Sequence, residues 1–429
     1  MASYQSLTKE ELLQEREKLL AEYESYKSKG LKLDMSRGKP GAEQLNLSLP
    51  MLDALNSVSD FTAEDGTDCR NYGVVDGIPE AKRLMASLMG VQPDEVIVGG
   101  NSSMNMMYDA IARAMTHGMC GAGKPWMKQN KVKFLCPVPG YDRHFAVCEH
   151  FGIEMINISM NADGPDMDVV EKMVNGDEAV KGIWCVPKFS NPSGITYSDE
   201  VVRRFANLSP KAPDFRIFWD NAYFIHDLYE PRVELLNLFS EAKKAGKEDM
   251  VLMFSSTSKV SYPGAGIAAL AASRRNIEII KKQMSVQTIG YDKMSQLRHA
   301  RYFKSVDFVH EHMKKHAEIL RPKFELVLSE MEKELAPLGI AEWEKPLGGY
   351  FISLNTMNGC AKQVVALCRE AGVVLTPAGS AYPYKQDPND SNIRIAPSFP
   401  PIGELAVTAK LLCLCVKLAA AEKLIKQKM

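Results

Sequence analysis

A lysine in a polar turn is the first residue whose surroundings indicate chemistry. Lys259 lies in the segment FSSTSKVSYPGAG (254–266), directly after the apolar run MVLMF. A lysine becomes a Schiff-base nucleophile when its surroundings lower its pKa. The hydroxyl groups of Ser255, Ser256 and Ser258 provide donors for a phosphate. The same segment also fits a surface loop with a solvated lysine, so it does not decide alone.

A carboxylate at the end of an apolar run gives a second signal. Asp220 follows RIFW in the segment FWDNAYF (218–224). A buried carboxylate needs a cationic or donating partner. A protonated pyridine nitrogen would serve, and that contact keeps the ring an electron sink. Tyr223 could donate to the phenolic oxygen of such a ring. The alternative is that Asp220 caps the N-terminus of a helix.

Two turns add polar groups that suit a phosphorylated ligand. Asn191 lies in an Asn-Pro-Ser-Gly turn, and its amide could hold a cofactor oxygen, although a plain turn fits as well. The segment VGGNSSMNMMYDAI (98–111) joins a strand to a helix start, so N–H groups and the helix dipole face one spot. Ser102 and Ser103 add hydroxyl donors there. The geometry of 98–111 suits a phosphate, but a loop with two glycines does not decide this alone.

One arginine lies inside a short apolar strand near the C-terminus. Arg394 belongs to NIRIAPSFP (392–400). A lone arginine in such a strand needs an anionic partner. A substrate carboxylate is one candidate, because guanidinium and carboxylate pair through two hydrogen bonds. A buried structural ion pair is the other.

The elements that position these residues alternate between strand and helix from about 51 to 300. Apolar β-branched runs predict strands at 95–98, 132–136, 154–158, 182–186, 216–219, 250–254 and 267–271. Longer amphipathic stretches predict helices at 79–90, 103–117, 142–151, 166–175, 198–207 and 274–284. This alternation predicts an α/β fold, a mainly parallel seven-stranded sheet with helices on both faces. Ligands of such sheets bind beyond the carboxyl ends of the strands, where the candidate residues fall.

The remaining segments predict a smaller α+β domain. Helices are expected at 8–29, 304–335, 360–371 and 402–427, with strands at 348–354 and 373–375. Thr8 and Glu11 form a capping box for the first helix. Residues 31–50 are expected to be extended. We therefore expect three units: an N-terminal helix and arm that pack with the small domain (1–50), a large domain (51–303) and a small C-terminal domain (304–429).

Composition narrows the class of protein. The 52 basic residues nearly balance the 53 acidic ones, which favours neither nucleic acid nor an anionic membrane as partner. No apolar run approaches the ~20 residues of a membrane span. The N-terminus lacks a signal peptide, and the nine cysteines lack CxxC spacing. We expect a cytoplasmic protein with reduced thiols and no metal site.

Taken in order, these segments resemble the fold-type I pyridoxal-phosphate aminotransferases. The resemblance extends from about Arg37 to Phe399 and includes an aromatic residue, Tyr141, in PVPGYDRHF. SRGKPG, QTIGYDK and FSNPSG make the chain most similar to a group of bacterial aspartate aminotransferases distinct from the better-known subgroups. The implied cofactor is pyridoxal 5'-phosphate.

The resemblance implies a role for each candidate residue. Lys259 would hold the cofactor as an aldimine and shuttle the Cα proton, and Asp220 would pair with the pyridine nitrogen. Tyr223 and Asn191 would bond the phenolic oxygen. Tyr141 would stack on the ring.

The phosphate and the substrate have implied partners too. Ser102, Ser103 and Ser256 would hold the phosphate, together with Tyr72 of a neighbouring subunit, which implies a homodimer with shared active sites. Arg394 would bind the α-carboxylate. Many relatives carry a phosphate-binding arginine about eight residues after the lysine, but the stretch YPGAGIAA has none.

The implied reaction is amino transfer between an amino acid, aspartate above all, and 2-oxoglutarate. A dicarboxylic substrate needs a second cation, and Arg37 in a Gly/Pro loop is favoured over Lys39, Lys293, Arg298 and Arg301. Alanine-type transaminase, β-lyase or decarboxylase chemistry remains open, because the fold alone does not separate these reactions. An aminotransferase-like regulatory sensor is the alternative from another class.

Overall fold

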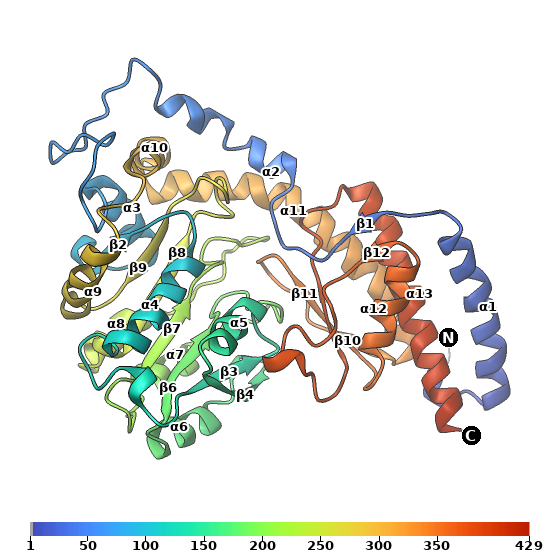
Figure 1. Ribbon diagram of the computed structural model, residues 1–429. Coiled ribbons are helices and arrows are strands. Elements are labelled where there is room, and N and C mark those ends of the chain that lie inside the picture. Colours follow the sequence, from blue (N-terminus) through green and yellow to red (C-terminus); the bar gives the residue numbers. More distant parts are fainter. Residues whose placement is uncertain (1–2, 429) are drawn as a thin grey trace.

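All seven strands expected between residues 95 and 271 form in the computed structural model, which describes residues 3–428 (Figure 1). They are β2 (Val96–Val98), β3 (Lys133–Val138), β4 (Glu154–Asn161), β6 (Val180–Cys185), β7 (Arg216–Asp220), β8 (Val251–Ser256) and β9 (Ala268–Ala271). An additional two-residue edge strand, β5 (Gly164–Pro165), makes the sheet eight-stranded in the order β2-β9-β8-β7-β6-β3-β4-β5. Strands β4, β3, β6, β7 and β8 run parallel, and β9 is antiparallel to both neighbours.

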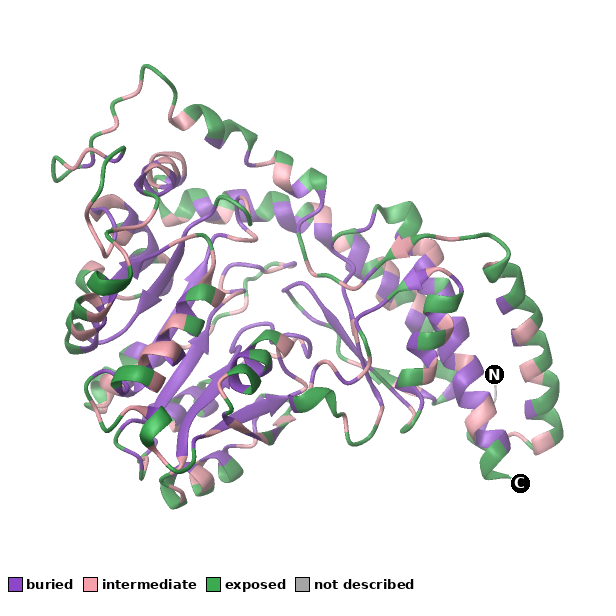
Figure 2. Cartoon of the chain, in the orientation of Figure 1, coloured by how far each residue is buried: buried purple, intermediate pink, exposed green. Residues whose placement is uncertain are grey.

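Burial of both faces explains why the central strands are apolar throughout. Every residue of β6, β7 and β8 is buried (Figure 2). Successive side chains of a strand point to opposite faces. Trp219 accordingly packs with Phe205 in the cluster on one face, whereas Phe218 packs with Phe134 on the other. A sheet covered on both faces needs such strands.

Helices cover this sheet and form, with it, the large lobe. The expected ones are α3 (Pro79–Met89), α4 (Ser103–His117), α5 (Asp142–His150), α6 (Met167–Gly176), α7 (Asp199–Ala206) and α9 (Arg274–Gln287). Two were not predicted, α8 (Leu238–Lys244) and α10 (Lys293–Phe303). Helix α10 is rich in polar residues and yet buries Lys293, Gln296 and His299, so it lacks the apolar stripe by which a helix is predicted.

The small lobe combines the two ends of the chain. It holds α1 (Lys9–Lys27), β10 (Ala341–Trp343), β11 (Ile352–Thr356), α12 (Ala361–Glu370), β12 (Val373–Val374), β13 (Asn392–Ile395) and α13 (Ile402–Gln427). The long helix α11 (Val306–Glu334) connects the lobes, and α1 packs along α13 (Figure 1). Strands β10, β11 and β13 form an antiparallel sheet. The domain limits at residues 50 and 303 stay a prediction.

The N-terminal arm differs from the extended segment that we expected. Strand β1 (Leu33–Asp34) pairs with β12, but α2 (Ala42–Asn46) is helical. The buried Gln44 stabilises the start of α2, because its Oε1 accepts a hydrogen bond from the N–H of Gly41. Within residues 3–428, no helix has both the length and the apolar character needed to cross a membrane.

Candidate active site

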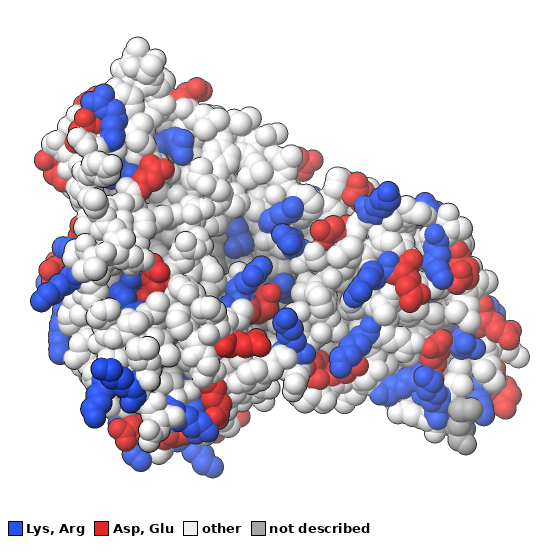
Figure 3. Space-filling model, viewed as in Figure 1, with Lys and Arg blue, Asp and Glu red and all other residues white. Residues whose placement is uncertain are grey.

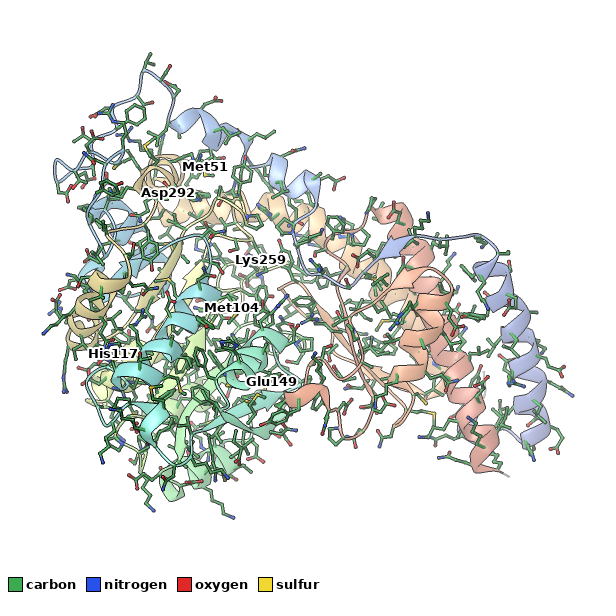
Figure 4. The ribbon with its side chains drawn as sticks, in the orientation of Figure 1. Met51, Met104, His117, Glu149, Lys259 and Asp292 are labelled. Atoms are coloured by element: carbon green, nitrogen blue, oxygen red, sulfur yellow. The ribbon has the colours of Figure 1, made fainter. Side chains whose placement is uncertain are left out.

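The strand ends of the large lobe bring the candidate residues together. Asp220 is the last residue of β7, and it pairs in register with Phe254 of the adjacent β8. Ser256 ends β8, and Lys259 follows three residues later. Figure 4 shows Lys259 near the middle of the molecule, where the lobes meet. The parallel order of β7 and β8 therefore places these groups at one edge.

Asp220 is held by a histidine that sequence reasoning missed. Its Oδ2 lies 3.0 Å from Nε2 of His144, and His144 stacks on Trp184 at 4.4 Å between ring centroids. The other oxygen, Oδ1, is buried and has no hydrogen-bond partner among the described residues. Asp220 starts no helix, so the capping alternative is wrong. The carboxylate keeps one oxygen free for a ligand.

Lys259 lies among aromatic rings. Its Nζ is 5.0 Å from the ring centroid of Tyr223 and 5.8 Å from that of Tyr350. Burial lowers the pKa of Lys259 from 10.5, and the charge of Asp220 opposes this shift only in part. The side chain is only partly exposed, which disagrees with a freely solvated lysine. A neutral amine is therefore accessible at lower pH than in an ordinary lysine.

Several polar side chains near Lys259 stay uncharged. Burial raises the pKa of Tyr223 well above its usual range, and it raises the pKa of Tyr141 to about 12. Burial also lowers the pKa of His226, with a further contribution from the charge of Lys259. Neither ring nitrogen of His226 has a partner among residues 3–428. Tyr223, Tyr141 and His226 are thus neutral polar groups.

The hydroxyl groups expected to hold a phosphate lie around one loop. Ser102 precedes α4, but its side chain makes no capping hydrogen bond, and Ser103 is the first residue of that helix. Ser256 donates to Ser258 Oγ at 3.0 Å, and Ser258 donates to the carbonyl of Asn101 at 3.2 Å. The two loops that carry the serines are therefore in contact at the start of α4, as the phosphate prediction requires.

Eight residues after Lys259, where the resemblance leads us to expect an arginine, the chain has the buried Ile267, and Gly266 before it is tightly packed. A Cβ at Gly266 would lie 2.7 Å from Thr257 Oγ1 and 2.9 Å from the carbonyl oxygen of Tyr262. Such distances are well inside van der Waals contact. Close packing of the loop therefore excludes any side chain at Gly266.

Arg394 reaches the same site from β13 of the small lobe. Its Nη1 donates to Asp142 Oδ1 at 2.8 Å and to Asn191 Oδ1 at 3.4 Å. The guanidinium carbon lies 4.9 Å from the ring centroid of Phe351. Arg394 thus forms an ion pair with Asp142, which is the structural alternative to a substrate carboxylate that the sequence left open. Asp142 itself was not predicted as part of the site.

Two of the predicted site residues are exposed in the described chain. Tyr72 is 83% exposed, so it belongs to no interior contact of its own subunit. Arg37 is exposed, and the neighbouring Gly38 lies so close to Phe351 that an added Cβ would be 2.3 Å from its Cζ. The backbone next to Arg37 therefore lies against Phe351, the residue whose ring also contacts Arg394.

The other cations considered for a distal carboxylate are engaged elsewhere. Lys293 donates to the carbonyl of Gly73 and Arg301 to that of Asp60, while Arg298 donates to Ser295 and Lys39 lies over the Phe399 ring. Figure 3 shows the surface hollowed between the lobes, with basic side chains at this hollow. No group of three potential metal ligands occurs among the described residues.

A mainly parallel sheet with a buried carboxylate and a partly buried lysine at its strand ends, faced by an arginine from a second lobe, agrees with the fold-type I aminotransferases that the sequence resembles. The chain belongs to the family whose model is described as "Aspartate amino-transferase", which matches residues 7–428. It is therefore an aspartate aminotransferase-like enzyme.

Individual relatives agree with this assignment. An aspartate aminotransferase of Corynebacterium glutamicum is 45% identical over 406 residues, covering 95% of this chain and 94% of the relative. The crystal structure of an aspartate transaminase from that organism matches with a TM-score of 0.96 at 44% identity, covering 99% of both chains. The α-aminoadipate aminotransferase of Thermus thermophilus, complexed with N-(5'-phosphopyridoxyl)-L-leucine, shares the fold alone, with a TM-score of 0.71 at 18% identity over 92% of this chain and 93% of its own.

Proposed function

We propose that this enzyme uses pyridoxal 5'-phosphate to transfer the amino group between aspartate and 2-oxoglutarate. The observation that carries the proposal is the free, buried Oδ1 of Asp220 at the same sheet edge as Lys259. A buried carboxylate oxygen without a donor is costly unless a ligand supplies one. The protonated nitrogen of a pyridine ring is such a donor, so the residues fit the cofactor.

The cofactor, when bound, supplies an attachment point for the amino group and an electron sink next to the amino acid's Cα. Lys259 would anchor it and would move the Cα proton of the amino acid, a task for which a lowered pKa suits the amine. Asp220, oriented by His144, holds the ring nitrogen in its protonated form. Tyr223 and Asn191 bind the phenolic oxygen, and Tyr141 stacks on the ring.

The phosphate is held by Ser102, Ser103 and Ser256 and by the N-terminus of α4. The free hydroxyl of Ser102 supports this role. Because the stretch YPGAGIAA after Lys259 has no arginine, the binding relies on neutral donors and the helix dipole. At the substrate end, Arg394 binds the α-carboxylate, and Arg37 meets the distal carboxylate of aspartate.

A second copy of the chain completes the site. Tyr72, Val286 and Ile289 are 83%, 91% and 63% exposed, and the segments that carry them meet where Lys293 donates to the carbonyl of Gly73 at 2.9 Å. Exposed apolar side chains on adjoining segments mark an interaction surface. We propose a homodimer in which Tyr72 reaches the partner's phosphate. Light scattering tests this, and a fully active monomer would contradict it.

The substrate is tested by a half-reaction screen. The purified enzyme, loaded with pyridoxal phosphate, is mixed with single amino acids, and the absorbance band of the bound cofactor is followed. Aspartate and glutamate should remove the band at low concentration, whereas alanine should act weakly. Strong loss with alanine and none with aspartate would overturn the substrate assignment, and release of ammonia and pyruvate from suitable β-substituted substrates would favour a β-lyase.

A further inference from the structure

Arg394 holds a carboxylate of the chain itself. Asp142 Oδ1 lies 2.8 Å from Nη1, and Asn191 Oδ1 lies 3.4 Å from the same nitrogen. A guanidinium Nη carries two N–H bonds. Asp142 and Asn191 therefore use both hydrogens of Nη1, while Nε is buried without a partner among the described residues.

Nη1 of Arg394, which Asp142 and Asn191 share, lies on the side of the guanidinium that a substrate would approach. Asn191 is the residue that we place beside the cofactor, so Nη1 is the part of Arg394 that faces the reacting end of the site. An α-carboxylate that approaches from Asn191 meets a nitrogen whose hydrogens are already taken. It gains a full hydrogen bond from Nη1 only when Asp142 leaves, and two carboxylates on one cation would also repel each other.

Asp142 is free to leave. Its side chain is 32% exposed, and it is the first residue of α5, so it can turn toward solvent without breaking a strand or the core. An acidic side chain at a helix N-terminus stays favourable after such a turn, because it faces the positive end of the helix dipole. The side chain of Arg394, by contrast, is only 10% exposed and is held against Phe351.

We propose that Asp142 is a specificity-determining residue, an internal carboxylate that occupies Arg394 in the substrate-free enzyme and yields to the α-carboxylate of the substrate. This inference rests on the proposed function, which places the α-carboxylate at Arg394. Asp142 makes every carboxylate ligand bind more weakly than Arg394 alone would allow, so the enzyme favours ligands that make further contacts. It acts on binding and not on proton transfer.

The test compares Asp142→Asn and Asp142→Ser with the wild-type holoenzyme. Succinate, a dicarboxylate without an amino group, is titrated into each, and its dissociation constant is measured by calorimetry. Both variants should bind succinate roughly two- to fivefold more tightly, the range expected for removal of one partly exposed competing ion pair. KM for aspartate should fall by a similar factor, with kcat changed less than twofold by the same argument.

A matched control separates this effect from a general loss of charge. Asp199 is also the first residue of a helix and pairs with an arginine, Arg203, at 3.1 Å, but it lies on the outer surface of α7. Asp199→Asn should leave succinate binding unchanged. Equal or weaker succinate binding in both Asp142 variants would overturn the inference while the wild type still transaminates. Failure of the wild type to transaminate any amino acid would overturn the proposed function itself.

Discussion

Asp220 and His144 form a buried pair, with 3.0 Å between Oδ2 and Nε2, although 76 residues separate them in the chain. The histidine takes one carboxylate oxygen and leaves Oδ1 for a ligand. Stacking on Trp184 fixes the imidazole ring. His144 is therefore a positioning residue that aims the free oxygen of Asp220.

Replacement of Asp220 by asparagine should remove the charge while keeping the shape of the side chain. The proton on the ring nitrogen would lose its partner, so electron withdrawal would weaken. We expect kcat to fall roughly 10²–10⁴-fold, the usual range for removing a group that controls proton transfer. Single-turnover absorbance with aspartate measures it. A variant within threefold of the wild type would show that Asp220 has no such role.

The reactivity of Lys259 should depend on pH in a way that reports its surroundings. Burial lowers its pKa below 10.5, so the neutral amine forms at lower pH than in a free lysine. Competitive labelling of the apoenzyme with an amine-selective reagent, read by mass spectrometry, gives the midpoint. Nα-acetyl-lysine, whose side-chain amine is free, is added to the same reaction as the reference. A midpoint at or above that of acetyl-lysine would contradict the effect of burial.

His299 should make the protein sensitive to acid. Its Nε2 lies 2.8 Å from Ser261 Oγ and its Nδ1 lies 2.7 Å from the carbonyl oxygen of Ser295, and burial lowers its pKa from 6.5 to about 4. Between these values the unfolded chain binds a proton that the folded chain does not. The free energy of unfolding therefore falls as pH drops from 6.5 to 4, by about 3 kcal/mol from this group.

The variant His299→Asn isolates that contribution. Its free energy of unfolding should be lower at pH 7, because hydrogen bonds are lost, but its further decrease between pH 7 and pH 4 should be smaller than in the wild type. Urea unfolding of both apoproteins at the two pH values gives the comparison. Equal decreases in both proteins would show that His299 titrates normally.

Two glycines of the loop after Lys259 should respond differently to the same substitution. A Cβ at Gly266 meets Thr257 and a backbone carbonyl oxygen, whereas a Cβ at Gly264 has nothing within 4 Å. Gly266→Ala should destabilise the protein by about 1–3 kcal/mol through overpacking, and it should weaken cofactor binding. Gly264→Ala is the control and should stay close to the wild type in thermal unfolding. Equal effects would mean that the loop adapts.

The sequence predicted the strands, and it singled out Lys259 as the candidate cofactor lysine, because both depend on local patterns. Apolar runs predicted all seven main strands, and the small polar residues after β8 marked Lys259. Helix α10 was missed since its buried residues include Lys293, Gln296 and His299, which carry no apolar period. Helix α8 was missed for another reason, because it spans only seven residues.

Contacts between distant residues could not be predicted in this way. Asp142 and Arg394 are 252 positions apart, and only the packing of the lobes brings them to 2.8 Å. His144 could have been found from the sequence. It lies three residues after Tyr141, in the first turn of α5, and Tyr141 was already expected beside the cofactor. The missing arginine was noted from the sequence, but the tight packing of the loop at Gly266 needed the structure.

The most direct test of the account is the identity of the lysine that binds the cofactor. Holoenzyme is reduced with borohydride, digested, and analysed by mass spectrometry for the phosphopyridoxyl group. We predict the group on Lys259 in the peptide after β8, and no labelled peptide from a Lys259→Ala variant treated in the same way. A phosphopyridoxyl group on another lysine, such as the buried Lys188, with Lys259 unmodified, would contradict the central claim.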